Sequence, residues 1–294
     1  MFSGSHRTIS AFGDEIHPDL EVQLDVLDQL GITSLDLRSV DGTNIIDLDD
    51  EKIDRIETAV TERGVTVPVI GSPVGKVDVT GGSERSATRE KTDRDVGSFA
   101  DQLSRLDRSI AIATRFDAPY VRVFSYYPPD GDHPETHQDE IIRRMRQLVE
   151  RAEAAGITLL HENVPGLYGN SPLLLRELVT AIDSPNFRVI FDAANFYKYG
   201  SKPYPEALLQ LVEYVECVHI KDAIRRPNGA VEMVPLGEGD IEIAAILRAL
   251  DARGFDGWLS LEPHLSLADP SQGLSGRDAF VREAHTFAEL LETV

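Results

Sequence analysis

Short apolar segments of strand length alternate with longer amphipathic segments along the whole chain, and this alternation constrains the fold more than any other feature. Two consecutive parallel strands need a crossover of about a dozen residues or more, which a helix supplies. The apolar segments predict strands at Arg7–Asp14, Ser34–Arg38, Val65–Ile70, Tyr120–Phe124, Ile157–Glu162, Phe187–Asp192, Val215–Ile220 and Trp258–Glu262.

Leucine and isoleucine recur at helical spacing between these strands, and glycine follows several of the periodic segments as a stop signal. Asp240 is expected to cap one helix at its N-terminus, and Pro227-Asn-Gly is expected to form a turn or hairpin. The polar stretch 81–94 is expected to be irregular. The expected helices span 18–30, 49–63, 135–155, 204–212, 240–253 and 277–294. Two more helices are expected: one that ends near residue 116, and one that carries Leu174 and Leu178.

Eight strands that alternate with about eight helices over 294 residues predict a single (β/α)₈ TIM barrel, an α/β fold covering residues 1–294. The rival is an open, doubly wound sheet. No Gly-x-Gly-x-x-Gly follows the first strand, so the dinucleotide-binding version of that fold loses its main support. In a barrel, the active site lies at the C-terminal ends of the strands.

The formal charge of −21 disfavours a nucleic-acid partner, because phosphate binding needs a positive field. The chain has 23 Arg but only 6 Lys. Acidic, lysine-poor surfaces resemble those of proteins from salt-loving organisms, where molar salt screens the self-repulsion. An ordinary acidic cytosolic enzyme is the alternative.

The chain carries one cysteine, Cys217, in a predicted core strand, so no intrachain disulfide can form. No apolar run approaches the 18 or so residues of a membrane span. No charged and then apolar N-terminal segment marks a signal peptide. We therefore expect a cytoplasmic protein with no membrane partner.

Four predicted strands deliver a metal-ligand type of side chain at their C-terminal ends: Glu162, Asp192, His219 and Glu262. Alone, each has an ordinary explanation, since strand-end carboxylates are often solvated or cap helices and strand histidines often bond within the core. Together, three carboxylates brought close would repel one another and need a compensating cation. Oxygen ligands with one imidazole suit Mn²⁺, Mg²⁺ or Co²⁺, with Zn²⁺ also admitted.

Five motifs make the chain recognisable. They resemble the sugar phosphate isomerase/epimerase family, the xylose isomerase-like barrels. The resemblance implies that the four strand-end residues hold one divalent metal, Mn²⁺ first among the candidates. The motifs are His161-Glu-Asn-Val-Pro-Gly, Phe191-Asp-Ala-Ala-Asn, His219-Ile-Lys-Asp, Gly237-Glu-Gly-Asp and Gly257-Trp-Leu-Ser-Leu-Glu-Pro-His.

In isomerases and epimerases of that family, the carboxylates matching Glu162 and Glu262 face each other across the substrate. The resemblance implies that one removes a proton beside a carbonyl and the other returns it, through a metal-stabilised enediolate. It also places Arg225 at the substrate oxygens. Further candidates for substrate contacts are Lys221, Asn195, His264 and Tyr168, with Glu15 and Arg122 on the pocket wall and Asp222 as a loop-fixing residue.

Two departures from the family pattern matter. Many relatives carry histidine where Asn195 stands, and asparagine cannot shuttle a proton at neutral pH. The DNA-repair endonuclease IV branch needs further histidines, but Glu232-Met-Val-Pro stands where an Asp-x-His pair would supply one. Together with the charge of −21, these residues exclude DNA cleavage from the leading hypotheses.

The leading hypothesis is a metal-dependent isomerase or epimerase of a small keto-sugar or related polyol ketone. The alternative is a dehydratase of the inosose or dehydroshikimate type on the same scaffold. A non-catalytic sugar-binding barrel is a third hypothesis, against which both facing carboxylates weigh. The sequence leaves the oligomeric state open, and dimers and tetramers, which are common in the family it resembles, are the homo-oligomers to test.

Overall fold

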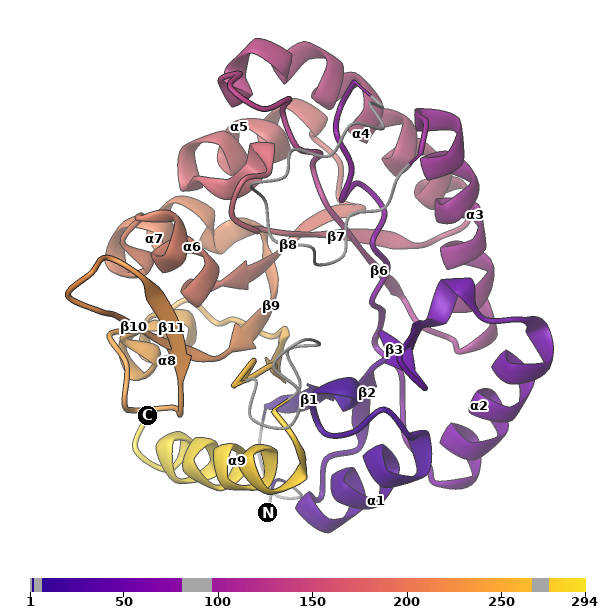
Figure 1. Cartoon of the computed structure of the whole chain (residues 1–294), viewed down its shortest axis with the longest axis vertical. Helices are drawn as coiled ribbons and strands as arrows, with labels where there is room; N and C mark the ends of the chain where they lie inside the picture. The colour runs from indigo at the N-terminus through magenta and orange to yellow at the C-terminus, as the bar shows by residue number, and fades with distance from the viewer. Residues whose placement is uncertain (1, 3–6, 81–96, 266–274) are drawn as a thin grey trace.

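Eight parallel strands form one sheet that curves into a barrel, and helices surround it (Figure 1). The computed structural model describes residues 2, 7–80, 97–265 and 275–294. The strands run in the order β2-β1-β12-β9-β8-β7-β6-β5. Their bounds are β1 Thr8–Phe12, β2 Ser34–Asp36, β5 Val69–Ile70, β6 Tyr120–Val123, β7 Thr158–Glu162, β8 Phe187–Asp192, β9 Val215–Ile220 and β12 Trp258–Leu261.

The barrel closes between β2 and β5. Backbone N–H groups of Leu35 and Leu37 donate to the carbonyls of Thr66 and Val69, at 2.9 and 3.1 Å. Parallel bridges also join these two segments. The strand expected over Val65–Ile70 therefore contributes along its length, although the regular ladder is confined to its last two residues. The predicted TIM barrel is confirmed.

The described helices follow the strands around the barrel in chain order (Figure 1). Two short antiparallel pairs lie outside the barrel sheet: β3 Ser39–Val40 with β4 Thr43–Asn44, and β10 Asp222–Arg225 with β11 Val231–Val234. The helices are α1 Leu20–Leu30, α2 Asp50–Glu62, α3 Phe99–Arg115, α4 Gln138–Ala154, α5 Pro172–Ile182, α6 Ala193–Tyr199, α7 Leu208–Leu211, α8 Ile243–Asp251 and α9 Arg277–Leu291.

The second antiparallel pair is the hairpin expected around Pro227-Asn-Gly. The irregular stretch expected at 81–94 falls outside the described residues. Among the described residues, no helix is both long enough and apolar enough to cross a bilayer.

Two expectations about helices were wrong, and one helix was not predicted. Helix α6 was missed, although Asp192 caps it by accepting the N–H of Asn195 and Gly200 ends it in the left-handed region. The helix expected over 204–212 is broken into a π turn, the short α7 and a 3₁₀ turn. Asp240 does not cap α8, because that helix begins at Ile243. The carboxylate of Asp240 instead accepts the backbone N–H of Arg225.

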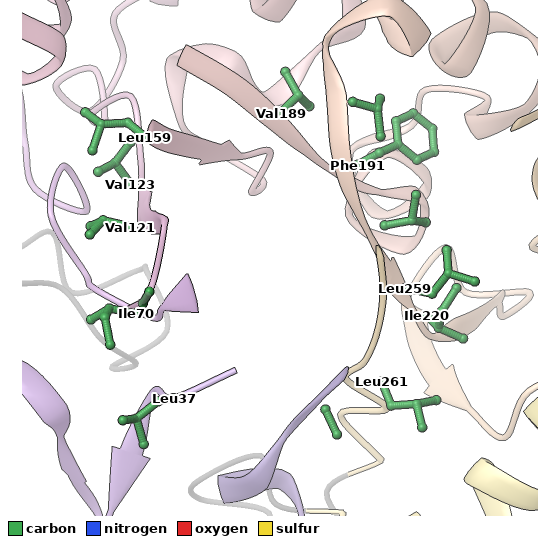
Figure 2. Close-up of a cluster of buried hydrophobic side chains, with 14 of the residues drawn as sticks. Leu37, Ile70, Val121, Val123, Leu159, Val189, Phe191, Ile220, Leu259 and Leu261 are labelled. Carbon is green, nitrogen blue, oxygen red and sulfur yellow. The ribbon is translucent and has the colours of Figure 1, made fainter. Parts of the chain in front are cut away.

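Alternation along each strand separates two environments. One set of side chains points outward, where the helices pack on it, and Figure 2 shows these residues distributed around the barrel. The other set points inward and carries the polar residues near the strand ends. The labelled outward residues in Figure 2 are Leu37, Ile70, Val121, Val123, Leu159, Val189, Phe191, Ile220, Leu259 and Leu261, all of them buried.

Candidate metal centre

The four strand-end residues predicted as ligands meet at the C-terminal end of the barrel. Glu162 and Asp192 end β7 and β8, His219 is the penultimate residue of β9, and Glu262 follows β12 directly. One candidate ligand atom from each lies within 4.8 Å of the other three. All four residues are buried, with exposed fractions of 4% or less.

His219 faces the carboxylates without a hydrogen bond. Its Nδ1 lies 3.0 Å from Glu262 Oε2, 3.6 Å from Glu162 Oε1 and 3.7 Å from Asp192 Oδ2. Among the described residues, neither ring nitrogen has a partner in hydrogen-bonding geometry. A buried imidazole nitrogen surrounded by carboxylate oxygens and left unbonded fits a metal ligand.

Neighbouring charges shift the pKa values of three of these groups. Burial acts to lower the pKa of His219, but Glu262 and Glu162 outweigh it and raise that pKa well above its usual range. Burial acts to raise the pKa of Glu262, yet Lys221 and the two neighbouring imidazoles hold it well below its usual range. Arg122 and His219 likewise lower the pKa of Glu162 against burial. Ionised carboxylates held together in this way suit a divalent cation.

Asp192 is positioned by the start of α6. Its Oδ1 accepts the backbone N–H of Asn195 at 2.8 Å, and its Oδ2 accepts the side-chain amide of Asn195 at 2.7 Å. That amide also donates to the carbonyl of Asn163 at 3.0 Å and lies 3.4 Å from Glu162 Oε1. The amide of Asn195 therefore joins two candidate ligands, Asp192 and Glu162. This role does not require a side chain that can shuttle a proton.

Two arginines hold the facing carboxylates. Arg122 Nη1 donates to Glu162 Oε2 at 3.0 Å, and Arg38 Nη1 donates to Glu262 Oε1 at 2.6 Å. Both guanidinium groups lie over the ring of Phe12, which also meets the His219 ring edge-on at 5.2 Å. Each guanidinium thus fixes a carboxylate from its side of the barrel.

Arg38 was not predicted, although a signal for it was present. It follows Asp36 by two residues, so it lies on the inward face at the end of β2, as the predicted ligands do on their own strands. Arg38 also donates to Asp14 at 2.7 Å and to Glu15 at 3.3 Å. Arginine is not a metal-ligand type, and the predicted ligands come from the last four strands only.

Several predicted contact residues do lie at the centre. Lys221 Nζ lies 2.6 Å from Asp192 Oδ2 and 2.8 Å from Glu262 Oε2. His264 bridges Glu15 Oε1 at 2.8 Å and Glu262 Oε1 at 3.2 Å. Burial acts to lower the pKa of His264, but these two carboxylates raise it to about 9.

Two other predicted contact residues lie elsewhere. Arg225 is exposed; its guanidinium donates to the Tyr197 carbonyl at 2.8 Å and lies over the Tyr197 ring, in a surface pocket of about 290 Å³. The hairpin of β10 and β11 carries it there. Tyr168 is fully buried, and its backbone N–H donates to Tyr126. No described hydrogen bond joins either residue to the four candidate ligands.

Asp222 fixes the loop beyond β9, as expected. Its two carboxylate oxygens accept backbone N–H groups from four residues at 2.8–3.1 Å: Ala223, Gly237, Gly239 and Ile241. It lies three residues after His219, so it anchors the segment that follows the strand carrying His219 and Lys221.

A family model described as "Xylose isomerase-like TIM barrel" matches residues 24–282. An uncharacterized protein of Methanocaldococcus jannaschii is 31% identical over 157 residues, which cover 51% of this chain and 52% of that protein. The 3-dehydroshikimate dehydratase of Bacillus anthracis is 22% identical over 178 residues, covering 56% of this chain and 62% of that enzyme. The chain thus matches less than two thirds of the length of either relative.

Solved structures share the fold over almost the whole chain. The IOLI protein with a binding zinc atom has a TM-score of 0.75 at 17% identity, covering 97% of this chain and 98% of that one. A D-tagatose 3-epimerase-like protein has a TM-score of 0.75 at 20% identity, covering 98% of each.

Proposed function

Because the chain belongs to the xylose isomerase-like TIM barrel family, we propose that it is a divalent-metal-dependent isomerase or epimerase. Its substrate would be a small keto-sugar or a related polyol ketone. The observation that carries the proposal is the convergence of Glu162, Asp192, His219 and Glu262 within 4.8 Å at the active-site end of the barrel.

The proposed ligands are these four residues, and Mn²⁺ is the proposed metal, with Mg²⁺, Co²⁺ or Zn²⁺ as alternatives. Once bound, such a cation supplies Lewis acidity to a substrate carbonyl, which acidifies the neighbouring C–H. The charge of −21 fits a protein that does not bind nucleic acid. We further propose a cytoplasmic location, no membrane partner and a homo-oligomeric assembly.

The chain's own contribution is a pair of carboxylates. Glu162 ends β7 and Glu262 follows β12, so they approach the site from strands that are separated by β8 and β9. One can remove a proton beside the carbonyl, and the other can return a proton to the neighbouring carbon or to the opposite face. Arg122 and Arg38 hold the two carboxylates in place.

Proton exchange in deuterium oxide tests the proposal. The metal-loaded protein is incubated with a panel of ketoses and cyclitol ketones, and NMR follows the α-hydrogen and the product. Glu162→Gln and Glu262→Gln should each lower the exchange rate by about 10²–10⁴-fold, the range for general acid–base groups. Glu216→Gln, on the same barrel but bonded to the Tyr120 hydroxyl, is the matched control and should retain activity. Equal rates in the wild type and both site variants would contradict the proposal.

A dehydratase is the second candidate, and the 22% identity to a 3-dehydroshikimate dehydratase favours it. One carboxylate of the pair Glu162 and Glu262 would remove the α-proton, and a β-hydroxyl would then be protonated and leave as water. Mass spectrometry separates the two reactions, since isomerisation and epimerisation conserve the substrate mass whereas dehydration lowers it by one water.

A further inference from the structure

Lys221 lies among the candidate metal ligands, and its position has a consequence for metal binding. Its side chain is 2% exposed, and its ammonium contacts Asp192 Oδ2 at 2.6 Å and Glu262 Oε2 at 2.8 Å. Both carboxylates belong to the proposed ligand set. The ammonium is therefore bound where a metal would need oxygen atoms.

Each of the three ligand carboxylates already has a cationic partner without a metal. Glu162 pairs with Arg122. Glu262 pairs with Arg38, which also binds Asp14 and Glu15. Lys221 contacts both Asp192 and Glu262. A divalent cation would add two positive charges beside these buried cations. Such an excess is unfavourable where water cannot screen it.

The hydrogen-bonding capacity of Asp192 points the same way. Its Oδ2 receives the Asn195 amide at 2.7 Å and the Lys221 ammonium at 2.6 Å, which occupies both lone pairs of that oxygen. Asn195 is held in addition by the Asn163 carbonyl. The donor that can leave is Lys221, because its contacts are with Asp192 and Glu262, the oxygens that a metal would take.

Distance makes coexistence unfavourable as well. Metal–oxygen distances of about 2.1 Å would place a metal within about 5 Å of an ammonium that shares an oxygen with it. Two cations at such a short distance in a buried site repel each other strongly.

We propose that Lys221 is an internal counter-cation of the ligand set and that a divalent metal displaces it from Asp192 and Glu262. This inference rests on the proposed metal site. The displaced ammonium, one residue beyond β9, then becomes available to a substrate oxygen at the barrel mouth. Metal loading thus creates the substrate contact, so the metal binds before the substrate.

Amine labelling of the full-length protein tests the displacement. The chain has only 6 lysines, so mass spectrometry can follow each one after reductive methylation. Lys221 should react slowly in EDTA and at least about tenfold faster with one equivalent of Mn²⁺, because burial in an ion pair blocks its free amine form. Lys52 and Lys202 serve as internal standards whose rates should stay constant.

The outcomes separate this inference from the proposed function. If calorimetry shows Mn²⁺ bound while Lys221 stays protected, the displacement is wrong and the metal site stands. If the folded protein binds no divalent metal, the proposed function fails together with this inference.

A variant gives an independent readout. Lys221→Met keeps the side-chain length but removes the charge, so Mn²⁺ should bind at least about tenfold more tightly than to the wild type, with no ammonium to displace. The melting temperature of this variant in EDTA should fall, because the carboxylates lose their counter-cation. Lys202→Met, at an exposed position away from the ligand set, should leave the Mn²⁺ dissociation constant unchanged. Equal or weaker binding by Lys221→Met would overturn the proposal.

Discussion

Replacing Asp222 by asparagine should destabilise the protein strongly although the two side chains have nearly the same shape. The aspartate is 1% exposed, and each of its oxygens accepts two backbone N–H groups. Asparagine keeps one acceptor oxygen, while its NH₂ group would face two N–H donors. Two charge-assisted hydrogen bonds are lost, and two buried donors lose their partner.

The size of the effect follows from these contacts. Hydrogen bonds to charged groups contribute about 1.5–3 kcal/mol each, so two of them amount to about 3–6 kcal/mol. Burial of the ionised carboxylate carries a desolvation cost, which raises the pKa of Asp222 against the effect of the four N–H donors. The neutral asparagine is relieved of that cost. We therefore expect the lower end, a loss of about 3 kcal/mol in the free energy of unfolding.

Urea unfolding measures this loss. Trp258 is the only tryptophan and is 4% exposed, so its fluorescence reports the unfolding of the barrel. Glu232→Gln is the matched control, because its carboxylate makes one exposed ion pair with Arg226 at 2.7 Å and should contribute less than about 1 kcal/mol. A loss below about 1 kcal/mol for Asp222→Asn would refute the reasoning about the loop.

Three further predictions follow from single positions. Gly75→Ala should cost more than about 2 kcal/mol in urea unfolding, because a Cβ would lie 1.9 Å from a carbonyl oxygen, whereas Gly131→Ala, with a similar φ but open space, should cost only about 1 kcal/mol. Burial raises the pKa of Glu283 to about 7, so the folded state holds the carboxyl proton more tightly than the unfolded state does. The free energy of unfolding should therefore fall as the pH rises between about pH 5 and 8. Glu283→Gln should flatten that part of the stability–pH curve, and an unchanged slope would contradict the role of Glu283. Cys217 is buried, which raises its thiol pKa to about 12, so a thiol reagent should label it only after denaturation; rapid labelling of the native protein would contradict its burial.

The strand-end residues could be predicted because two simple rules act together. Side chains alternate across a strand, and all barrel strands end on the same face, so a polar residue that ends an apolar run is directed to one place. The two rules predict that Glu162, Asp192, His219 and Glu262 converge, and in the structure one candidate ligand atom from each lies within 4.8 Å of the others. Arg38 obeys the same rules and was missed because arginine is not a metal ligand.

Residues on loops could not be placed in this way. Arg225 lies six residues after His219, and the family resemblance implied that it contacts substrate oxygens, but the pairing of β10 with β11 directs it toward Tyr197 instead. Asn195 was predicted as a substrate contact, whereas α6, absent from the predicted elements, directs its amide to Asp192. Long-range pairing decides both positions, and local sequence carries little information about it.

Calorimetric titration of EDTA-treated protein with Mn²⁺ tests the metal centre most directly. The account predicts one ion per chain for the wild type. His219→Ala should remain folded by circular dichroism and bind the ion about 100-fold more weakly or not at all, since one of the four ligands is lost. His137→Ala removes an imidazole that contacts Asp132, which is not one of the four ligands, and this variant should bind like the wild type. Folded wild-type protein that takes up no ion, or a His219→Ala variant with unchanged affinity, would contradict the four-ligand centre.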